Sequence, residues 1–541
     1  MKDISSTGSF IDFTLENFIY VDKTEYIPKL VKLKRVFISR PRRFGKSLTL
    51  DTIATLFETG VEPYFKGTWI YDKWTEPTYP VLRLNFLNLD NFSIDDFKNK
   101  LNSYITEFAN KIGVKEYAEK KEPEDSIDSM LEKLREEKRQ IVILIDEYDY
   151  QLTSNINHDD LYKQFQQKIK RFYANIKDKL AIKFLGITGV TRLKDVEIFS
   201  IGSDINDITN ESAFSQLIGF TRDEIKKYYI DYLKLAASYE NKCRVEEVTD
   251  AQIESMLDMM AQNYDGYCFD EDYEKKVFNT WSVNKFFQTM VGKKKVQFGE
   301  YWYDNGGLPS ILVNYLKTHE LNIFEYLDKD KFLKVSSDDF KNPTALTTIN
   351  QNVLMCQTGY LTLRSDLNKT STVALGIPNG EIYKALNRLL ANNIFKGNTD
   401  ITDDYGRSLL EVGTVDDIIN LFNSALNSVS YDNYPIVSES SVQNMLKLYL
   451  LGAHQEVLSE VHEAKGRADL VVNTDNRRIV FEFKYAKNEA EAKSKLSEAV
   501  EQIKTRDYGN ILPKKNELIR IATVFNADPK VRAFTENQIV P

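Results

Sequence analysis

The chain has 541 residues, which is too many for one hydrophobic core, and this length predicts about three domains. Hydrophobic residues make up 42% and charged residues 28% of the chain, as in ordinary globular proteins, and no apolar run is long enough to span a membrane. The net charge of −9 argues against non-specific coating of DNA, although a locally basic cleft remains compatible with it. The scattered Cys243, Cys268 and Cys356 lack the spacing of a zinc site or a disulfide frame. With no signal-peptide pattern at residues 1–10, we expect a cytoplasmic protein without membrane contact.

The first informative stretch is residues 36–50, VFISRPRRFGKSLTL. A short apolar strand runs into a basic turn, and Gly45, Lys46 and Ser47 stand at the start of an expected helix over residues 48–58. Backbone N–H groups at a helix start bind anions, a lysine there reaches the β- and γ-phosphates, and a serine hydroxyl ligates Mg²⁺. The pattern therefore predicts a phosphate-binding loop, although Arg40 stands where the usual pattern has glycine. A basic surface turn before a helix is the alternative.

The segments around this loop predict further α/β structure. Residues 17–23 indicate a strand edge, and residues 24–33 a helix. Residues 79–87 alternate as a strand does, and residues 94–108 predict a helix capped by Ser93.

Residues 140–150, QIVILIDEYDY, predict a buried parallel strand that carries Asp146 and Glu147 to its carboxyl end. Ligands bind at that end in open α/β sheets. Asp146 would hold Mg²⁺, and Glu147 would polarise the water that attacks the γ-phosphate. A strand that ends in a solvated acidic turn is the alternative, because Asp149 follows.

A third strand is expected over residues 181–190. Thr188, at its end, is the candidate sensor of the γ-phosphate. Arg192 could reach the phosphates of the same chain or of a neighbouring subunit, while a surface salt bridge explains it equally well.

These segments together resemble the AAA-ATPase-like family of bacterial proteins. The resemblance rests on four N-terminal motifs in this order: IYVDKT, ISRPRRFGKSLTL, ILIDEYD and GITGVTR. It continues through IGFTRDEI (218–225), YDGYCF (264–269), FNTWSV (278–283), QTGYLTL (357–363) and LGIPNGEI (375–382), and so covers most of the chain. In that family the RPRRFGKS form of the loop is usual. The resemblance therefore implies an ATP site in which Arg40, Arg42 and Arg43 add positive charge at the phosphates, and it leaves open whether ATP is hydrolysed.

The middle of the chain predicts mainly helices. Thr221 and Glu224 form a capping-box pattern ahead of one helix, residues 248–263 predict a second, and Ser282 is expected to cap a third that runs to residue 290. The aromatic turn at residues 264–269 is interpreted as packing.

The segments that follow are mixed. Residues 357–363 indicate a strand and residues 375–379 a turn. Residues 380–426 predict helices around an acidic connector at 398–407. We expect three domains with the bounds 1–220, 221–431 and 432–541.

The last hundred residues contain a second set of charged side chains on predicted strands. A helix over 441–451 and a short strand or helix end over 457–461, which carries Glu460, precede a hairpin over 466–486. Side chains alternate along a strand, so Glu482 and Lys484 share a face, and Asp469 lies on the neighbouring strand. A final strand over 518–525 is expected to close the sheet.

This arrangement suits a metal-dependent phosphodiesterase. Asp469 and Glu482 would bind Mg²⁺, with Glu460 as a further ligand, and Lys484 would orient the attacking water and stabilise negative charge. A simple ion pair between Glu482 and Lys484 is the alternative.

The same residues resemble the PD-(D/E)XK nuclease superfamily. The motif consists of Asp469 and Glu482-Phe483-Lys484, with Gly466-Arg467 ahead of it, Ala468 in place of the proline, and Gln502 on the following helix. The resemblance implies a Mg²⁺-dependent nuclease, with nucleic acid, foremost DNA, as its partner. Lysines on the helix over 487–505 would attract phosphates.

The sequence thus predicts a multidomain α/β protein with an N-terminal P-loop NTPase-like parallel sheet, a mainly helical middle and a C-terminal α/β restriction-endonuclease-like domain. Its expected function is ATP binding and hydrolysis that gates or powers cleavage of nucleic acid, with Mg²⁺ at both sites. Two alternatives remain: a nucleotide-dependent switch or remodelling ATPase whose nuclease-like domain only binds a partner, and an NTP-binding scaffold. A homo-oligomer is compatible with all of them.

Overall fold

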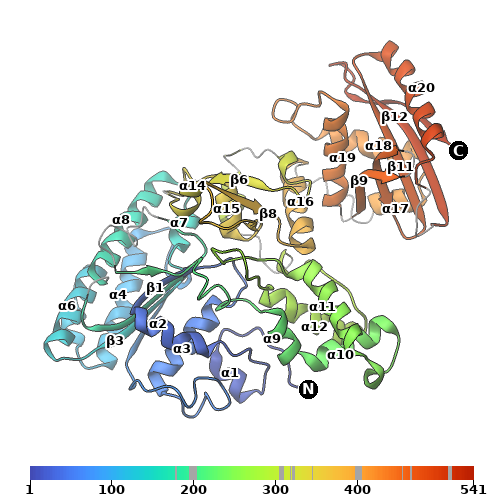
Figure 1. The fold of residues 1–541 in the computed structure, drawn as a ribbon. Helices are drawn as coiled ribbons and strands as arrows, with labels where there is room; N and C mark the ends of the chain where they lie inside the picture. The colour runs from blue at the N-terminus through green and yellow to red at the C-terminus, as the bar shows by residue number, and fades with distance from the viewer. Residues whose placement is uncertain are drawn as a thin grey trace. The chain divides into compact units, whose positions relative to one another are not determined.

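The computed structural model describes residues 1–176, 179–193, 204–303, 310–316, 319, 323–343, 345–395, 405–453, 455–463, 466–509 and 515–541. These residues form two compact units. Unit 1 comprises residues 1–321 and 330–382, and unit 2 comprises residues 322–329 and 383–541. Unit 1 therefore holds the expected nucleotide-binding region together with most of the expected helical middle (Figure 1).

A parallel sheet forms the centre of the first part of unit 1. Its described strands are ordered β2 (Val81–Asn85), β3 (Ile141–Asp146), β4 (Ile182–Gly189), β1 (Arg35–Ser39) and β5 (Asn206–Asp207). Each neighbouring pair is parallel. Every residue of β1 and β3 is buried, as expected of strands that are covered by helices on both faces.

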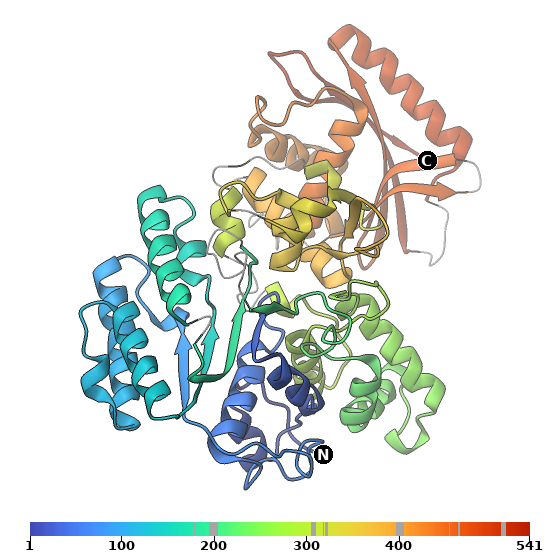
Figure 2. The ribbon, with the colours of Figure 1, turned by 60° about the vertical axis from the view of Figure 1, so that its left-hand side comes forward.

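Helices cover both faces of this sheet. Figure 2 shows α4 (Ile94–Lys111), α6 (Pro123–Glu136) and α8 (Asp159–Ile176) on one side, and α1 (Phe10–Leu15) and α3 (Lys46–Thr59) on the other. The predicted cap of α4 is confirmed, because the Ser93 hydroxyl accepts a hydrogen bond from the Asp96 N–H. Shorter helical pieces complete this part: η1 (Thr24–Tyr26), α2 (Ile27–Leu33), η2 (Phe86–Asn88), α5 (Lys115–Ala118) and α7 (Tyr150–Ser154).

A helical layer follows the sheet in the chain. It comprises α9 (Arg222–Tyr228), α10 (Ile230–Asn241), η4 (Val245–Glu247), α11 (Asp250–Tyr264) and α12 (Thr280–Lys293). The predicted capping box of Thr221 and Glu224 is present at α9. The predicted cap of α12 was wrong, because Asn279 accepts the N–H of Ser282 and the helix begins two residues before Ser282.

A small antiparallel sheet closes unit 1. Its described strands are ordered β6 (Leu333–Ser336), β8 (Thr372–Gly376) and β7 (Thr362–Leu363), beside α13 (Ser310–Leu316), α14 (Ser337–Lys341) and α15 (Gln351–Thr358). The expected strand over 357–363 was too long. Residues 357 and 358 end α15, and only residues 362 and 363 pair as a strand.

Unit 2 is built on a mixed sheet ordered β13 (Ala533–Val540), β12 (Glu517–Asn526), β11 (Arg477–Ala486), β10 (Gly466–Asn473) and β9 (Glu456–Glu463) among the described residues. The predicted hairpin of β10 and β11 is present, and β11 pairs in parallel with β12. The strand over 518–525 was expected to close the sheet, but β13 pairs antiparallel with its free side and forms that edge.

The helices of unit 2 are α16 (Gly380–Ile394, whose first residues belong to unit 1), α17 (Tyr405–Val412), α18 (Val415–Asn427), α19 (Glu439–Gly452) and α20 (Glu489–Arg506), with the short turn η6 (Ile323–Glu325). The first part of the acidic connector, residues 398–404, lies outside the described residues. Among the helices that the structure describes, none is long and apolar enough to cross a membrane.

Candidate functional site

The predicted phosphate loop joins the end of β1 to the start of α3. Gly45, the residue before the helix, has a φ of 104°, and Arg43 has a φ of 69°, so both backbones lie in the left-handed region. Glycine adopts such a φ freely, which explains its place at the last position before the helix. The first N–H groups of α3 have no partner within the helix and carry its positive dipole end, as an anion site requires.

The carbonyl groups of the loop are held by the protein itself. The buried Lys46 ammonium donates to the carbonyl oxygens of Arg40 (3.1 Å) and Pro41 (3.2 Å). It also lies 3.6 Å from the Glu147 carboxylate. Lys46 thus ties the loop to the acidic pair at the end of β3.

The helical layer holds the next two carbonyls of the loop. The Trp302 indole N–H donates to the Arg42 carbonyl (3.2 Å), and the Thr280 hydroxyl donates to the Arg43 carbonyl (3.1 Å). The Arg43 guanidinium lies 3.9 Å from the centre of the Trp281 ring. The FNTWSV segment, which the sequence linked to the family only by resemblance, therefore contacts the phosphate loop directly.

The acidic pair lies next to the loop, although β4 separates β3 from β1 in the sheet. The Ser47 hydroxyl donates to Asp146 Oδ2 (2.6 Å), and the Thr188 hydroxyl donates to Asp146 Oδ1. Asp146 therefore contacts Ser47, the candidate Mg²⁺ ligand on α3, and Thr188, the candidate γ-phosphate sensor on β4. Burial raises the pKa of Glu147, and Lys46 opposes part of that shift.

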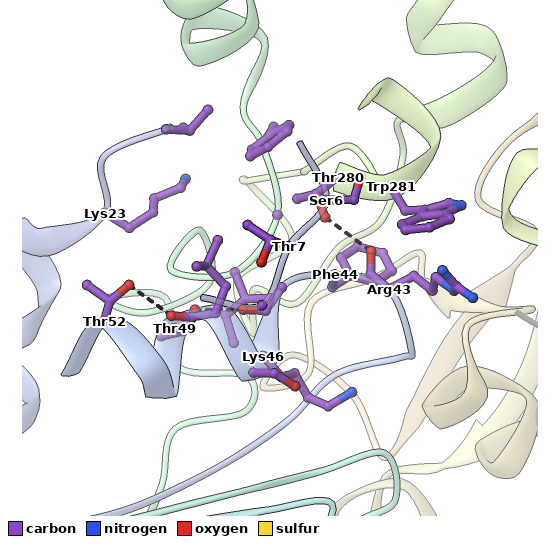
Figure 3. Close-up of a pocket in the computed structure, with 18 of the residues that line it drawn as sticks. Ser6, Thr7, Lys23, Arg43, Phe44, Lys46, Thr49, Thr52, Thr280 and Trp281 are labelled. Carbon is purple, nitrogen blue, oxygen red and sulfur yellow. Dashed lines mark hydrogen bonds between the residues drawn. The ribbon is translucent and has the colours of Figure 1, made fainter. Parts of the chain in front are cut away.

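A cavity of about 650 Å³ opens in front of the loop (Figure 3). Its volume lies in the range of small-molecule sites. The residues that line it come from the N-terminal segment, the phosphate loop, the acidic pair and the helical layer, and include Ser5, Thr7, Tyr20, Arg42, Arg43, Gly45, Lys46, Ser47, Glu147, Gly219, Trp281 and Asn284.

Two of the predicted phosphate contacts point elsewhere in this structure. Arg40 is 1% exposed, and its guanidinium donates to the carbonyls of Ser39 (2.9 Å) and Thr209 (2.6 Å) beneath the loop. It also stacks on Phe269, and burial lowers its pKa to about 9. The Arg192 guanidinium forms an ion pair with Asp207, as the salt-bridge alternative expected. Neither side chain lines the cavity.

In unit 2 the structure brings Asp469, Glu482 and Lys484 together on the hairpin. Asp469 Oδ2 accepts a hydrogen bond from the Phe483 N–H (2.9 Å) on the neighbouring strand. The Lys484 ammonium donates to Glu482 Oε1 (3.0 Å) and to the Phe483 carbonyl (3.1 Å). Unlike an exposed surface pair, Glu482 is 0% exposed and Lys484 is 5% exposed.

This cluster places two carboxyl groups, of Asp469 and Glu482, beside one ammonium group, of Lys484. Burial, with help from the Asp469 charge, raises the pKa of Glu482 to about 7 even though Lys484 is adjacent. Burial also acts to lower the pKa of Lys484, but the carboxylates of Glu482 and Glu439 outweigh it, so the net pKa is raised. Glu482 Oε2 is buried and has no hydrogen-bond partner among the described residues. Such an oxygen costs free energy unless something binds it, and a hard cation is a suitable partner.

Glu439 is a further residue of this cluster that the sequence patterns did not indicate. It lies in the first turn of α19, and its Oε1 accepts a hydrogen bond from the Lys484 ammonium (3.2 Å). Gln443, one turn further along, donates to the Asp469 carbonyl. Ser438, whose hydroxyl caps α19, was an available signal, because it places the helix start before residue 441 and Glu439 inside its first turn.

For two predicted residues of this site, Glu460 and Gln502, the structure gives no side-chain contact with the cluster. The side chain of Glu460 lies outside the described residues, although its backbone belongs to β9. Gln502 is half-buried on α20, and its side chain makes no hydrogen bond with the described residues. No group of three or more Asp, Glu, His or Cys side chains in the described ranges is arranged to hold a metal ion.

Comparisons with known proteins give a family match in each of two regions of the chain. Residues 5–199 match a family model described as predicted AAA-ATPase, and residues 437–535 match the PD-(D/E)XK nuclease superfamily. The "Uncharacterized protein in vnfD 5'region" of Azotobacter chroococcum mcd 1 is 25% identical over 528 residues, which are 95% of this chain and 94% of that protein. The crystal structure of Cdc6p from Pyrobaculum aerophilum aligns with 11% identity and a TM-score of 0.25 over 68% of this chain and 93% of that one, too low a likeness to support an argument.

These matches confirm both resemblances that the motifs indicated. The expected fold class is confirmed as well: a P-loop NTPase-like parallel sheet, a mainly helical middle and a C-terminal α/β domain of the PD-(D/E)XK type.

Proposed function

We propose that this chain, which joins a predicted AAA-ATPase domain over residues 5–199 to a PD-(D/E)XK nuclease superfamily domain over residues 437–535, is a cytoplasmic ATPase and Mg²⁺-dependent nuclease. Its substrate is nucleic acid, foremost DNA. The nucleotide state of unit 1 controls phosphodiester cleavage by unit 2. The observation that carries the nuclease half is the buried, unpartnered oxygen of Glu482 beside Asp469 and Lys484.

The ATPase half is supported by Lys46, Ser47 and Glu147, which line one cavity, and by Asp146, which accepts a hydrogen bond from Ser47. Lys46 and the start of α3 bind the phosphates, and Ser47 and Asp146 hold the Mg²⁺ that accompanies ATP. Glu147 lines the same cavity and acts on the attacking water. Burial raises the pKa of Glu147, which makes its carboxylate a stronger proton acceptor.

The nuclease half is supported by the chemistry of the hairpin. A divalent cation bound to Asp469 and Glu482 would supply a water of lowered pKa and would shield phosphate charge. The Lys484 ammonium is held between Glu482 and Glu439, so it is fixed in position to stabilise the negative charge that develops on the phosphate.

A cleavage assay tests the proposal. The full chain is incubated with Mg²⁺ on single- and double-stranded DNA and on RNA, with and without ATP, beside the variants Lys484→Ala and Lys46→Ala. We expect cleavage by the wild type, none by Lys484→Ala, and cleavage without an ATP effect by Lys46→Ala. Equal cleavage by wild type and Lys484→Ala would show that another protein or another site cuts the substrate.

ATP turnover that Lys46→Ala abolishes, without cleavage of any substrate, would instead favour the second candidate. In that case the chain is a nucleotide-dependent switch or remodelling ATPase whose nuclease-like unit only binds a partner. The ion pairs of Lys484 with Glu482 and Glu439 favour this candidate, because the ammonium group partly neutralises the carboxylates without a metal ion.

A further inference from the structure

Asp149, two residues after the acidic pair, is a buried carboxylate for which the proposed chemistry has no use. It is 1% exposed. Its Oδ2 accepts hydrogen bonds from the backbone N–H (2.6 Å) and the hydroxyl (2.5 Å) of Thr191, and its Oδ1 accepts from the Val190 N–H (3.3 Å). Although Asp149 stands at the N-cap position of α7, its side chain does not cap that helix. It is directed instead at the segment that follows β4.

Tyr148 contacts the same segment. Its N–H donates to the Thr188 carbonyl (3.1 Å), its hydroxyl donates to the Thr191 carbonyl (3.1 Å), and its hydroxyl oxygen accepts from the Leu193 N–H (3.2 Å). The tyrosine ring occupies the space that a Cβ at position 189 would need, so only glycine fits there. Tyr148 and Asp149 therefore bind residues 188–193 to the turn that carries the acidic pair.

That turn contains an unusual backbone. Glu147 has a φ of 53°, a left-handed conformation that is unfavourable for a residue with a side chain. Such a conformation persists only where the surroundings enforce it, and it is concentrated at functional sites. The Glu147 N–H donates to Asp146 Oδ1 (3.0 Å) on one side, and the Tyr148 and Asp149 contacts fix the backbone on the other. With this backbone, the Glu147 carboxylate lies 3.6 Å from Lys46.

We propose that Asp149 is a positioning residue for ATP hydrolysis, which holds Glu147 toward the cavity by bonding the acidic turn to the Thr191 segment. The inference rests on the proposed function, because it assigns a role in that same site. Asp149 touches neither nucleotide nor metal. Its loss lets the turn relax to an ordinary backbone, and the Glu147 carboxylate then leaves the position of the attacking water.

The positioning role has a distinct signature, because Glu147 lines the cavity and Asp149 does not. Replacing Asp149 by asparagine should therefore lower kcat and leave the affinity for the nucleotide nearly unchanged. A loss of folding alone would lower both.

The test compares Asp149→Asn with wild type in steady-state ATP hydrolysis and in titrations with a fluorescent ATP analogue. We expect kcat to fall at least about tenfold while the Kd for the analogue stays within about twofold. Thr191→Val is the second variant. It removes one of the three hydrogen bonds from the other side and leaves the other two in place, so kcat should fall less than in Asp149→Asn. Glu147→Gln is the control that removes the positioned group itself.

An unchanged kcat in Asp149→Asn would overturn the inference. So would a fall in ATP affinity together with the melting temperature in both variants, because that result describes a structural residue. Wild-type protein that binds ATP without turnover would be a failure of the proposed function itself. It is recognised because it occurs before any substitution is made, and it removes the inference as well.

Discussion

At the scale of single residues, Glu482 determines how the nuclease site responds to pH. Its pKa is raised to about 7 by burial and by Asp469. A cation needs the charged carboxylate, so protons compete with the metal below this pH. We predict that the affinity for Mg²⁺ or Mn²⁺ falls about tenfold for each pH unit below 7 and is constant at higher pH. Calorimetric titration of nucleotide-free protein between about pH 5.5 and about pH 8.5 measures this.

Glu482→Gln is the matched control for this measurement, because it keeps the shape of the side chain and removes its titration. In this variant both the tight cation binding and its pH dependence should disappear. If wild type and Glu482→Gln bind the cation equally across the pH range, the cation is bound elsewhere, for example at Ser47 and Asp146.

Arg40 and Arg42 are neighbours in the motif but differ in their surroundings. Arg40 donates to two buried carbonyls, whereas Arg42 lines the cavity. We predict that Arg40→Ala lowers the free energy of unfolding by roughly 1–3 kcal/mol, because the carbonyls of Ser39 and Thr209 lose their donor. Arg42→Ala should change stability by less than about 0.5 kcal/mol and weaken ATP binding. Thermal unfolding and a nucleotide titration of both variants separate the two effects.

The opposite pattern would assign Arg40 to the phosphates. Arg40→Ala would then retain the melting temperature of wild type and lose ATP affinity.

Residue patterns predicted the main residues of both candidate sites but not where every side chain points. The alternation of β11 was enough to place Glu482 and Lys484 on one face, because the period of a strand is fixed. The burial of Arg40 depends on how the loop turns after Ser39 and on Phe269, which is distant in the sequence. Glu439 reaches Lys484 only through the packing of α19 on the sheet. Contacts of that kind between distant segments have no local signal.

At the scale of elements, the N-terminal segment forms part of the nucleotide cavity. Side chains of α10 and α12 donate to its backbone: Tyr232 to the Lys2 carbonyl (2.9 Å), Gln288 to the Ile4 carbonyl (2.9 Å) and Asn284 to the Ser5 carbonyl (3.1 Å). Ser6 and Thr7 lie close to the start of α3 and to Thr280 in Figure 3. The segment therefore connects the helical layer to the cavity.

We predict that deletion of residues 2–8 weakens ATP binding about tenfold or more and leaves the binding of inorganic tripolyphosphate nearly unchanged. The reason is that these residues line the cavity without contributing to the phosphate loop. Competition titrations against a fluorescent ATP analogue measure both ligands.

Two variants make this deletion interpretable. Lys46→Ala should weaken both ligands, because it removes a phosphate contact. Gln288→Ala, which releases only the Ile4 carbonyl, should have a smaller effect on ATP alone. Equal losses for ATP and tripolyphosphate in the deletion would mean that the segment supports the loop and not the rest of the nucleotide.

The sequence predicted helices and strands correctly where a short local pattern, such as a capping box or an apolar run, is enough to specify them. The Thr221 capping box and the apolar run of β3 are such cases. The start of α12 was misplaced because Asn279 and Ser282 are both good caps, and the choice between them depends on tertiary contacts such as the bond from Thr280 to the phosphate loop. The edge strand β13 was missed because half of its residues are polar, as is common where a strand faces solvent.

At the scale of the whole molecule, the two proposed activities lie in separate compact units. One continuous helix, α16, begins in unit 1 and continues in unit 2. Its second residue, Glu381, accepts hydrogen bonds from the Ser282 hydroxyl (2.7 Å) and the Trp302 N–H (2.8 Å). Trp302 in turn holds the phosphate loop through the Arg42 carbonyl. A chain of direct contacts therefore links the nucleotide site to the first turn of this helix.

If ATP changes the affinity of unit 2 for DNA, thermodynamic linkage requires DNA to change the affinity for ATP by the same factor. Lys484→Ala allows this to be measured without cleavage. We predict that inserting a short run of glycines after Ile382, inside α16, abolishes both effects together. ATP hydrolysis and basal cleavage should persist, because neither site contains residues of α16. ATP titrations with and without DNA, and cleavage with and without ATP, measure the two effects.

An equal insertion after Lys294, in the exposed loop that follows α12, is the control for added chain length and should preserve the coupling. Coupling that survives the insertion in α16 would mean that the nucleotide signal reaches unit 2 by another route. If only one of the two effects is lost, the ATP effect on cleavage is kinetic. Reciprocity holds for binding free energies and not for rate constants. The pair of insertions thus separates a rigid helical connection from a tether.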